Sequence, residues 1–204
     1  MKNPKGLDDI ANLTEVDRLK EYLQKHYRIN EHDWNLIHGF FKPALIRSGE
    51  YFLRAGRICH RMGFIAKGVM RYTHFKEDGK EITCNFVSEN DFVGEPDSLL
   101  NHIPTDISQQ AVTDCRLITF TLEDMNSCRK VFPRFTEITA DITQKTIRSL
   151  LVQRTFLADR DAAGKYQYFM IHYPHILQRV PLGYIASFLD ITPQSLSRLR
   201  KNIS

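Results

Sequence analysis

Residues 180–204 constrain the fold of this 204-residue chain more than any other stretch, because they predict two short helices joined by a tight turn. Apolar residues repeat at the i, i+3, i+4, i+7 spacing of one buried helical stripe: Leu182, Ile185, Ala186 and Leu189. Pro181 suits the first turn of that helix, where a missing N–H costs nothing. The small side chain of Ala186 allows a second helix to cross closely, as in a helix-turn-helix.

The second helix of the pair has its own start signal. Thr192 is placed to cap it through the side-chain hydroxyl, and Pro193 occupies the first helical position. The spacing of the apolar residues predicts a buried stripe at Leu196, Leu199 and Ile203. We therefore expect a capped helix with one apolar face.

The opposite face of this second helix is polar and basic. At about 100° per residue, Gln194, Arg198 and Lys201 point away from the buried stripe. The flanking positions are also polar, and none is acidic: Ser195, Ser197 and Asn202. A helix fits the major groove of B-DNA, where Arg pairs with guanine and Gln with adenine through two hydrogen bonds. The spacing alone leaves two interpretations open, a DNA-reading helix and an ordinary helical hairpin with a solvated face.

Residues 185–200 resemble the helix-turn-helix of the CRP/FNR (catabolite-activator/fumarate-nitrate-regulator) family of bacterial transcription regulators, because small, apolar and polar positions fall in register. Such turns usually carry Gly where this chain has Asp190, which tolerates the left-handed conformation better than most residues. The resemblance implies base contacts from Gln194 and Arg198, and a base or phosphate contact from Lys201. The remaining contacts are expected nearer the phosphates: Thr192, Ser195, Ser197 and Arg200.

In that family a β-hairpin wing usually follows the helix-turn-helix. The sequence ends at Ser204, so the phosphate contacts of a wing are expected to be absent or supplied from elsewhere. The partners that the resemblance implies are double-stranded DNA, a second copy of this chain and RNA polymerase.

The pattern of residues 40–120 predicts short strands separated by turns that contain Gly, Asn and Asp. Such a pattern is typical of a sandwich or jelly roll. The strongest hairpin signal is Asp78-Gly79, with further strands expected at 51–53, 64–66, 69–72, 107–112 and 116–120. Three pieces resemble the cyclic-nucleotide-binding β-roll of the same family: Ile65–Arg71, Asp78–Glu81 and Asn90–Glu95. We therefore expect an α+β protein with an N-terminal β-roll (jelly roll), a long dimerisation helix and a C-terminal helix-turn-helix domain.

The long helix is predicted for residues 133–160, which contain no Gly and no Pro after Pro133. Its apolar residues form two stripes rotated from each other: first Phe135, Ile138 and Ile142, then Ile147, Leu150, Leu151 and Leu157. The resemblance implies that this helix pairs with its twin in a homodimer. Packing on both the roll and the twin would explain two stripes, whereas a helix packed wholly on its own roll is the alternative.

These patterns divide the chain into a helical lead-in and β-roll over 1–132, the long helix over 133–160 and the helix-turn-helix domain over 161–204. Within the lead-in, amphipathic stripes are expected over 16–23 and 34–41, and a hinge is expected over 161–164. The basic surplus lies at the C-terminal end. Residues 141–204 hold 9 of the 28 Lys/Arg and 4 of the 24 Asp/Glu, which leaves 19 and 20 for residues 1–140.

The composition argues against membrane and metal proteins. No run approaches the ~18 apolar residues that span a membrane, and the N-terminus lacks the apolar core of a signal sequence, so a cytoplasmic location is expected. The cysteines form no Cys-x-x-Cys pair, so reduced thiols and no metal or other cofactor are expected: Cys59, Cys84, Cys115 and Cys128. His172 and His175 straddle a Tyr-Pro pair, which is a poor spacing for metal ligands.

Two other functions compete with DNA binding. A cupin-like β-roll metalloenzyme needs clustered His and carboxylate ligands, but the sequence offers only the isolated His60, His74 and His102. A protein-interaction module, in which both C-terminal helices contact a protein, is the second alternative. No Ser/His/Asp or Cys/His arrangement points to catalysis, so we expect a protein that is not an enzyme.

The resemblance implies an effector pocket at Gly94 and Glu95, where the family's Glu accepts a ribose hydroxyl and an Arg meets the cyclic phosphate. Residues 96–108 contain no Lys or Arg, and they carry Asp97 and Asp106. A buried phosphate would lack its charge-assisted partner there, at a cost of several kcal/mol. We predict that cyclic AMP is not the effector, and that the pocket binds another small molecule or is structural only.

Overall fold

The computed structural model describes residues 14–203, with the backbone alone for Asn202 and Ile203, so the start of the predicted lead-in lies outside the described residues. The elements follow in this order: α1 (Glu15–Tyr27), α2 (Glu31–Ile37), the 3-10 helix η2 (His38–Phe40), β1 (Lys42–Ile46), β2 (Tyr51–Leu53), β3 (Arg61–Lys67), β4 (Met70–Phe75), β5 (Glu81–Val87), β6 (Phe92–Val93), α3 (Pro96–Asn101), β7 (Ser108–Ala111), β8 (Cys115–Thr121), α4 (Leu122–Val131), α5 (Phe135–Ala158), α6 (Ala162–His172), α7 (Pro174–Leu177), α8 (Leu182–Phe188) and α9 (Pro193–Ile203).

Two antiparallel sheets form the predicted β-roll, with strand orders β1-β8-β3-β6 and β2-β7-β4-β5. Alternate side chains of the strands point inward and build a shared apolar core that includes Ile65, Met70 and Leu117. The hairpin between β4 and β5 turns at Asp78-Gly79 as predicted, with Gly79 at φ 78°. The short-strand pattern of the sequence therefore gives the expected fold class.

The lead-in helices and the start of α5 cover one sheet of the roll. Helices α1 and α2 each begin with a capping box, at Thr14 and Asn30 respectively. Their buried residues join Phe64 and Ile118 of the sheet and Phe135 of α5 in one apolar cluster. The first predicted stripe of the long helix is thus confirmed as a surface that packs on the roll.

The second predicted stripe of α5 does not pack on the roll. Every residue from Thr143 to Val152 is exposed, with Ile147 at 53% and Leu151 at 62% of full exposure. Of that stripe, Leu157 is partly buried against the C-terminal helices. The middle of α5 therefore presents an apolar surface that nothing in the described part of this chain covers.

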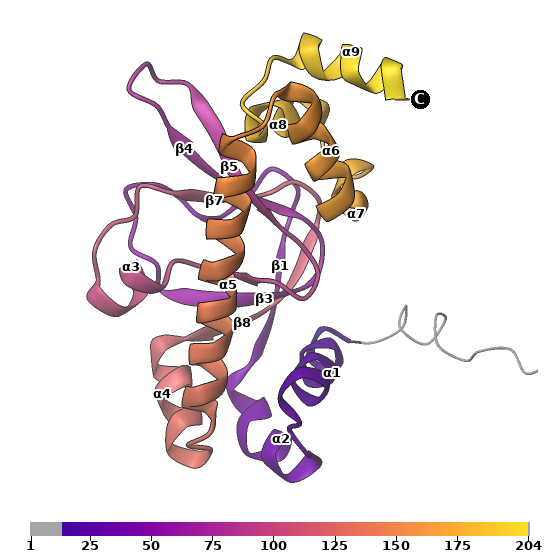
Figure 1. The fold of residues 1–204 in the computed structure, drawn as a ribbon. Coiled ribbons are helices and arrows are strands. Elements are labelled where there is room, and N and C mark those ends of the chain that lie inside the picture. The colour runs from indigo at the N-terminus through magenta and orange to yellow at the C-terminus, as the bar shows by residue number, and fades with distance from the viewer. Residues whose placement is uncertain (1–13, 204) are drawn as a thin grey trace, which may run out of the picture.

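Helices α6–α9 gather at one end of α5, and α4 lies at the other (Figure 1). Of the hinge predicted over 161–164, residues 162–164 belong to α6, and Asp161 caps that helix by accepting a hydrogen bond from the Gly164 N–H at 2.8 Å. Ala162 and Ala163 consequently form the first turn of that helix, and the break after α5 ends at Asp161. Within the described residues, no helix combines the length and hydrophobicity that a bilayer crossing requires.

Candidate nucleic-acid interface

The turn between α8 and α9 is closed by backbone hydrogen bonds. Asp190 adopts the left-handed conformation at φ 51°, as the sequence predicts. Its N–H donates to the Ser187 carbonyl at 3.2 Å, and the Ile191 N–H donates to the Ala186 carbonyl at 3.0 Å. This pair of bonds is a Schellman motif, which satisfies the last carbonyls of α8 and fixes the direction in which α9 leaves.

Thr192 caps α9 as predicted, because its hydroxyl accepts the Ser195 N–H at 3.1 Å. Pro193 is the first helical residue, whereas Pro181 precedes α8 instead of lying in its first turn. Leu196 is fully buried and Leu199 partly buried, so the expected apolar face of α9 packs on the helices beneath it. The side chain of Ile203 lies outside the described residues.

The outward face of α9 carries the side chains predicted to meet DNA. Six of the seven are exposed: Thr192, Gln194, Ser197, Arg198, Arg200 and Lys201. The seventh, Ser195, is half-buried, and its hydroxyl lies 2.9 Å from that of Thr192. Arg200 and Lys201 lie in the last turn, where positive charge suits the helix dipole. Gln194, Arg198 and Lys201 thus share the side of α9 opposite the buried Leu196, while Arg200 lies on a flank of the helix.

An apolar core joins the helix pair to the β-roll, a feature that the sequence analysis did not anticipate. The Phe86 ring on β5 lies 5.4 Å from that of Phe188 on α8 and 6.0 Å from that of Phe169 on α6. The Thr83 N–H of β5 donates to the Ser187 hydroxyl at 3.0 Å. The first helix of the pair is therefore seated on a strand of the roll.

Arg71 on β4 strengthens this junction from inside the sheet. Arg71 is only 5% exposed, and its guanidinium donates to Gln110 Oε1 at 2.7 Å and to Thr83 Oγ1 at 3.2 Å. It also pairs with Glu81 and lies 3.8 Å from the centroid of the Tyr184 ring on α8. Because Arg71 is paired and hydrogen-bonded on the roll, its guanidinium is held in a fixed position against the Tyr184 ring of α8.

A bidentate ion pair makes a third link between the roll and the C-terminal helices. Arg179 donates to both oxygens of Glu89, at 2.9 and 2.8 Å. Burial alone would raise the pKa of the Glu89 carboxyl, but the hydrogen bonds from Arg179 and from the Gly68 N–H outweigh it, so the pKa is lowered. Nearby, His175 Nε2 lies 3.0 Å from the Ser88 hydroxyl.

The residues predicted to form an effector pocket are engaged with the chain itself. The Glu95 carboxylate accepts hydrogen bonds from the N–H groups of Asp97 and Ser98 and caps α3. Gly94 has φ 131°, and a Cβ there would overlap the Met62 sulfur. Its carbonyl accepts from the buried Gln109 amide at 2.9 Å. Glu95 would have to leave α3 to meet a ribose, so these contacts favour the structural alternative for Gly94 and Glu95.

The two histidines considered as metal ligands contact different residues. The His172 ring packs at a tilt against that of Tyr168, with ring centroids 4.1 Å apart, whereas His175 faces Ser88. Among residues 14–203, no group of three or more His, Cys, Asp or Glu is arranged to hold a metal ion. The four cysteines are free thiols, and burial raises the pKa of Cys115 to about 11 and that of Cys128 to about 12.

Comparisons with known proteins give a family match over part of the chain and a shared fold over most of it. The cyclic nucleotide-binding domain family matches residues 45–130. FixK2 from Bradyrhizobium japonicum is 12% identical with a TM-score of 0.70, covering 80% of this chain and 84% of that chain. The catabolite activator protein of Thermus thermophilus is 17% identical with a TM-score of 0.56, covering 89% and 86%. A Eubacterium rectale protein described as a transcriptional regulator of the CRP/FNR family is 14% identical with a TM-score of 0.68, covering 90% and 87%.

No curated protein matches this chain by sequence. At identities of 12% to 17%, the likeness to the solved structures shows a shared fold. The Thermus protein is described as a catabolite activator and the Eubacterium protein as a transcriptional regulator.

Proposed function

We propose that this chain, which carries a cyclic nucleotide-binding domain and has the fold of the CRP/FNR-type transcription regulators, binds double-stranded DNA as a homodimer and regulates transcription. The observation that carries the proposal is the exposed surface of α9, which contains two arginines, a lysine and a glutamine but no acid. In the proposed complex Gln194 and Arg198 reach base edges, and Lys201 reaches a base or a phosphate. Thr192, Ser195, Ser197 and Arg200 lie nearer the phosphates and set the register.

In this proposal the chain has three functional parts. Residues 1–132 form the lead-in and sensor roll, 133–160 the dimerisation helix and 161–204 the DNA-binding domain. The exposed apolar side chains in the middle of α5 support pairing with a second copy, because water-exposed apolar stripes on a helix are usually covered in the functional assembly. Two recognition helices related by a two-fold axis would read half-sites about one helical turn apart. A protein with this role acts in the cytoplasm, where RNA polymerase is a further partner.

The structural relatives favour a regulator over the cupin-like enzyme. His60 precedes β3, His74 lies in β4 and His102 follows α3. Within the described residues they form no common metal site. For the sensor roll we propose that cyclic AMP is not the effector, because Glu95 caps α3 and no Lys or Arg lies within residues 96–108. Titration with cyclic nucleotides tests this, and micromolar binding would contradict it.

The test of DNA binding is selection of bound sequences from random duplex DNA, with and without cell extract. A near-palindromic site is expected, with affinity that falls steeply as salt rises because phosphate contacts release counterions. Arg198→Ala should cost about 1–3 kcal/mol and relax the preference at one base position. The matched control is Lys130→Ala, an exposed cation on α4.

If Arg198→Ala weakened binding to all DNA sequences equally, Arg198 would not read bases. Indifference of the purified protein to every duplex at low salt would leave the protein-interaction module as the better account of the helix pair.

A further inference from the structure

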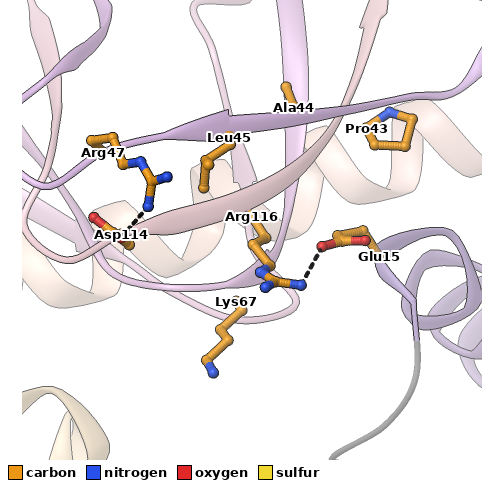
Figure 2. Close-up of a pocket in the computed structure, with 8 residues that line it drawn as sticks. All are labelled: Glu15, Pro43, Ala44, Leu45, Arg47, Lys67, Asp114 and Arg116. Carbon is orange, nitrogen blue, oxygen red and sulfur yellow. Dashed lines mark hydrogen bonds and ion pairs between the residues drawn. The ribbon is translucent and has the colours of Figure 1, made fainter.

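Two hollows on the β-roll differ in how their charges are arranged. The first has a volume of about 520 Å³ and lies beside β1 and β8. Figure 2 shows two of its arginines paired with acids, Arg47 with Asp114 at 2.9 Å and Arg116 with Glu15 at 3.1 Å. Because both acids of this lining are paired with arginines, the charge that is left over in the first hollow is that of Lys67.

The second hollow contains cations without matching acids. It has a volume of about 540 Å³, and its described lining is Tyr51, Phe52, Leu53, Arg54, Gly56, Arg57, Ile58, His60 and Pro104. That lining includes two arginines and a histidine but no carboxylate. Residues 51–64 contain three arginines and no acid, so the positive charge continues beyond the rim to Arg61.

Aromatic rings hold two of these arginines in place. The Arg54 guanidinium lies 3.8 Å from the centroid of the Tyr51 ring, and that of Arg61 lies 5.1 Å from the centroid of Phe52. A stacked guanidinium keeps the N–H groups at its edge available for a carboxylate, in a plane that the ring has already fixed. The cations are thus oriented before a partner arrives.

The floor of the hollow is fixed by hydrogen bonds between two loops. The Gly56 N–H donates to the Thr105 carbonyl at 2.7 Å, and the Thr105 N–H donates to the Arg57 carbonyl at 3.1 Å. The Cys59 N–H donates to the Ser98 hydroxyl of α3 at 2.8 Å. A preformed surface binds with a smaller loss of conformational entropy than a mobile loop.

We propose that this second hollow binds an acidic segment of a partner protein that also carries an apolar side chain. A small anion is a poorer occupant, because all three arginines are exposed and a single solvated ion pair contributes little. A DNA backbone is also a poorer occupant, since it lacks an apolar group to pack on Ile58 and Pro104. The exposed Leu100 and Ile103, on α3 and the loop that leads to Pro104, extend the apolar part of the surface. Helix α3 lies beside the roll and away from α9 (Figure 1), so the site does not depend on DNA binding.

The test is selection of random peptides, about a dozen residues long, displayed on phage and captured by the full-length protein. The enriched sequences are expected to carry two or more acids around an apolar residue. Their affinity should fall about tenfold or more for the double variant Arg54→Glu/Arg57→Glu. The matched control is Lys25→Glu/Lys130→Glu, which changes the same charge at exposed positions on α1 and α4 and should leave the affinity unchanged.

Two results would overturn the proposal. The first is enrichment of peptides without acids, or of acidic peptides that both double variants bind equally, which would reduce the effect to net charge. The second is binding of random duplex DNA that Arg54→Glu/Arg57→Glu abolishes while the control keeps it, which would assign the hollow to nucleic acid. Arg57→Ser alone repeats the comparison if the double variant melts below the wild type.

Discussion

Apolar side chains of the C-terminal helices are buried against the β-roll, whereas those in the middle of α5 are exposed. Phe188 of α8 packs on Phe86 of β5, so the roll holds α8, and through it α9, in position. Leu151 of α5 contacts solvent over most of its surface, in the described part of a single chain. The difference separates a contact within the chain from an exposed surface that, in the proposed homodimer, a second copy covers.

The largest effect on stability is expected in the core that β5 shares with the C-terminal helices. Phe86→Ala removes a ring that is 3% exposed and should lower the free energy of unfolding by about 3–5 kcal/mol, because it leaves a cavity between β5 and the C-terminal helices. Phe75→Ala on the same hairpin is the control, since that ring is 60% exposed and its loss should cost about 0.5 kcal/mol or less. Chemical denaturation measures both. Equal costs would mean that the roll and the helices do not share a core.

The second effect concerns the ion pair at the same junction. Arg179→Met leaves the half-buried Glu89 with the Gly68 N–H but without its charged partner, and should cost about 1.5–3 kcal/mol. The control Arg47→Met removes a pair whose partners are both more than half exposed, at an expected cost of about 1 kcal/mol or less.

The lowered pKa of Glu89 gives this ion pair a pH signature. A carboxyl with a lowered folded-state pKa stabilises the protein above its unfolded value of about 4.3, and that contribution is lost as pH falls through the folded-state value. The difference in unfolding free energy between wild type and Arg179→Met should therefore be full at neutral pH and shrink below about pH 4. A difference that stays constant down to acid unfolding would show that the pair does not link the two regions electrostatically.

The third effect concerns the exposed apolar side chains in the middle of α5. Leu151→Asp places a charge in the exposed stripe of α5, so the single chain should keep its fold while the dimer dissociates. Because each substitution occurs twice in a two-fold dimer, the dissociation constant should rise about tenfold to a hundredfold, or about 1.4–2.8 kcal/mol. Sedimentation at several concentrations measures it, with Leu45→Asp on β1 as a control of similar exposure. A wild type that sediments as a monomer throughout would refute the pairing of α5.

The sequence predicted the helix pair well because its signals are local. The Thr192 cap, the left-handed Asp190 and the two faces of α9 each depend on residues within about one or two helical turns. The hairpin at Asp78-Gly79 was predictable for the same reason. Neither the capping of α3 by Glu95 nor strand β1 was predicted, since a short Pro-containing strand and a helix that starts with Glu-Pro carry weak periodicity.

The junction between the roll and the C-terminal helices was beyond sequence reasoning. Phe86 and Phe188, or Arg71 and Tyr184, are about a hundred residues apart, and nothing in the periodicity of either segment names its partner. One signal was available: Arg71 lies in a strand that is otherwise apolar or neutral, and a buried cation requires partners. The need of a buried Arg71 for partners would have indicated that another element contacts β4 on that face.

The smallest effect on stability is expected at Asp190, in the turn between α8 and α9. Asp190→Gly relieves the left-handed strain of a residue with a Cβ, a gain of about 0.5–1 kcal/mol, whereas Asp190→Ala should cost about 1 kcal/mol. The ion pair of Asp190 with Lys76, at 3.9 Å, is exposed on both sides and offsets little of the gain. Thermal unfolding of Asp190→Gly with and without Lys76→Ala separates the two contributions. If Asp190→Gly proved less stable than wild type in both backgrounds, the carboxylate and not the backbone conformation would be what holds α9 in place.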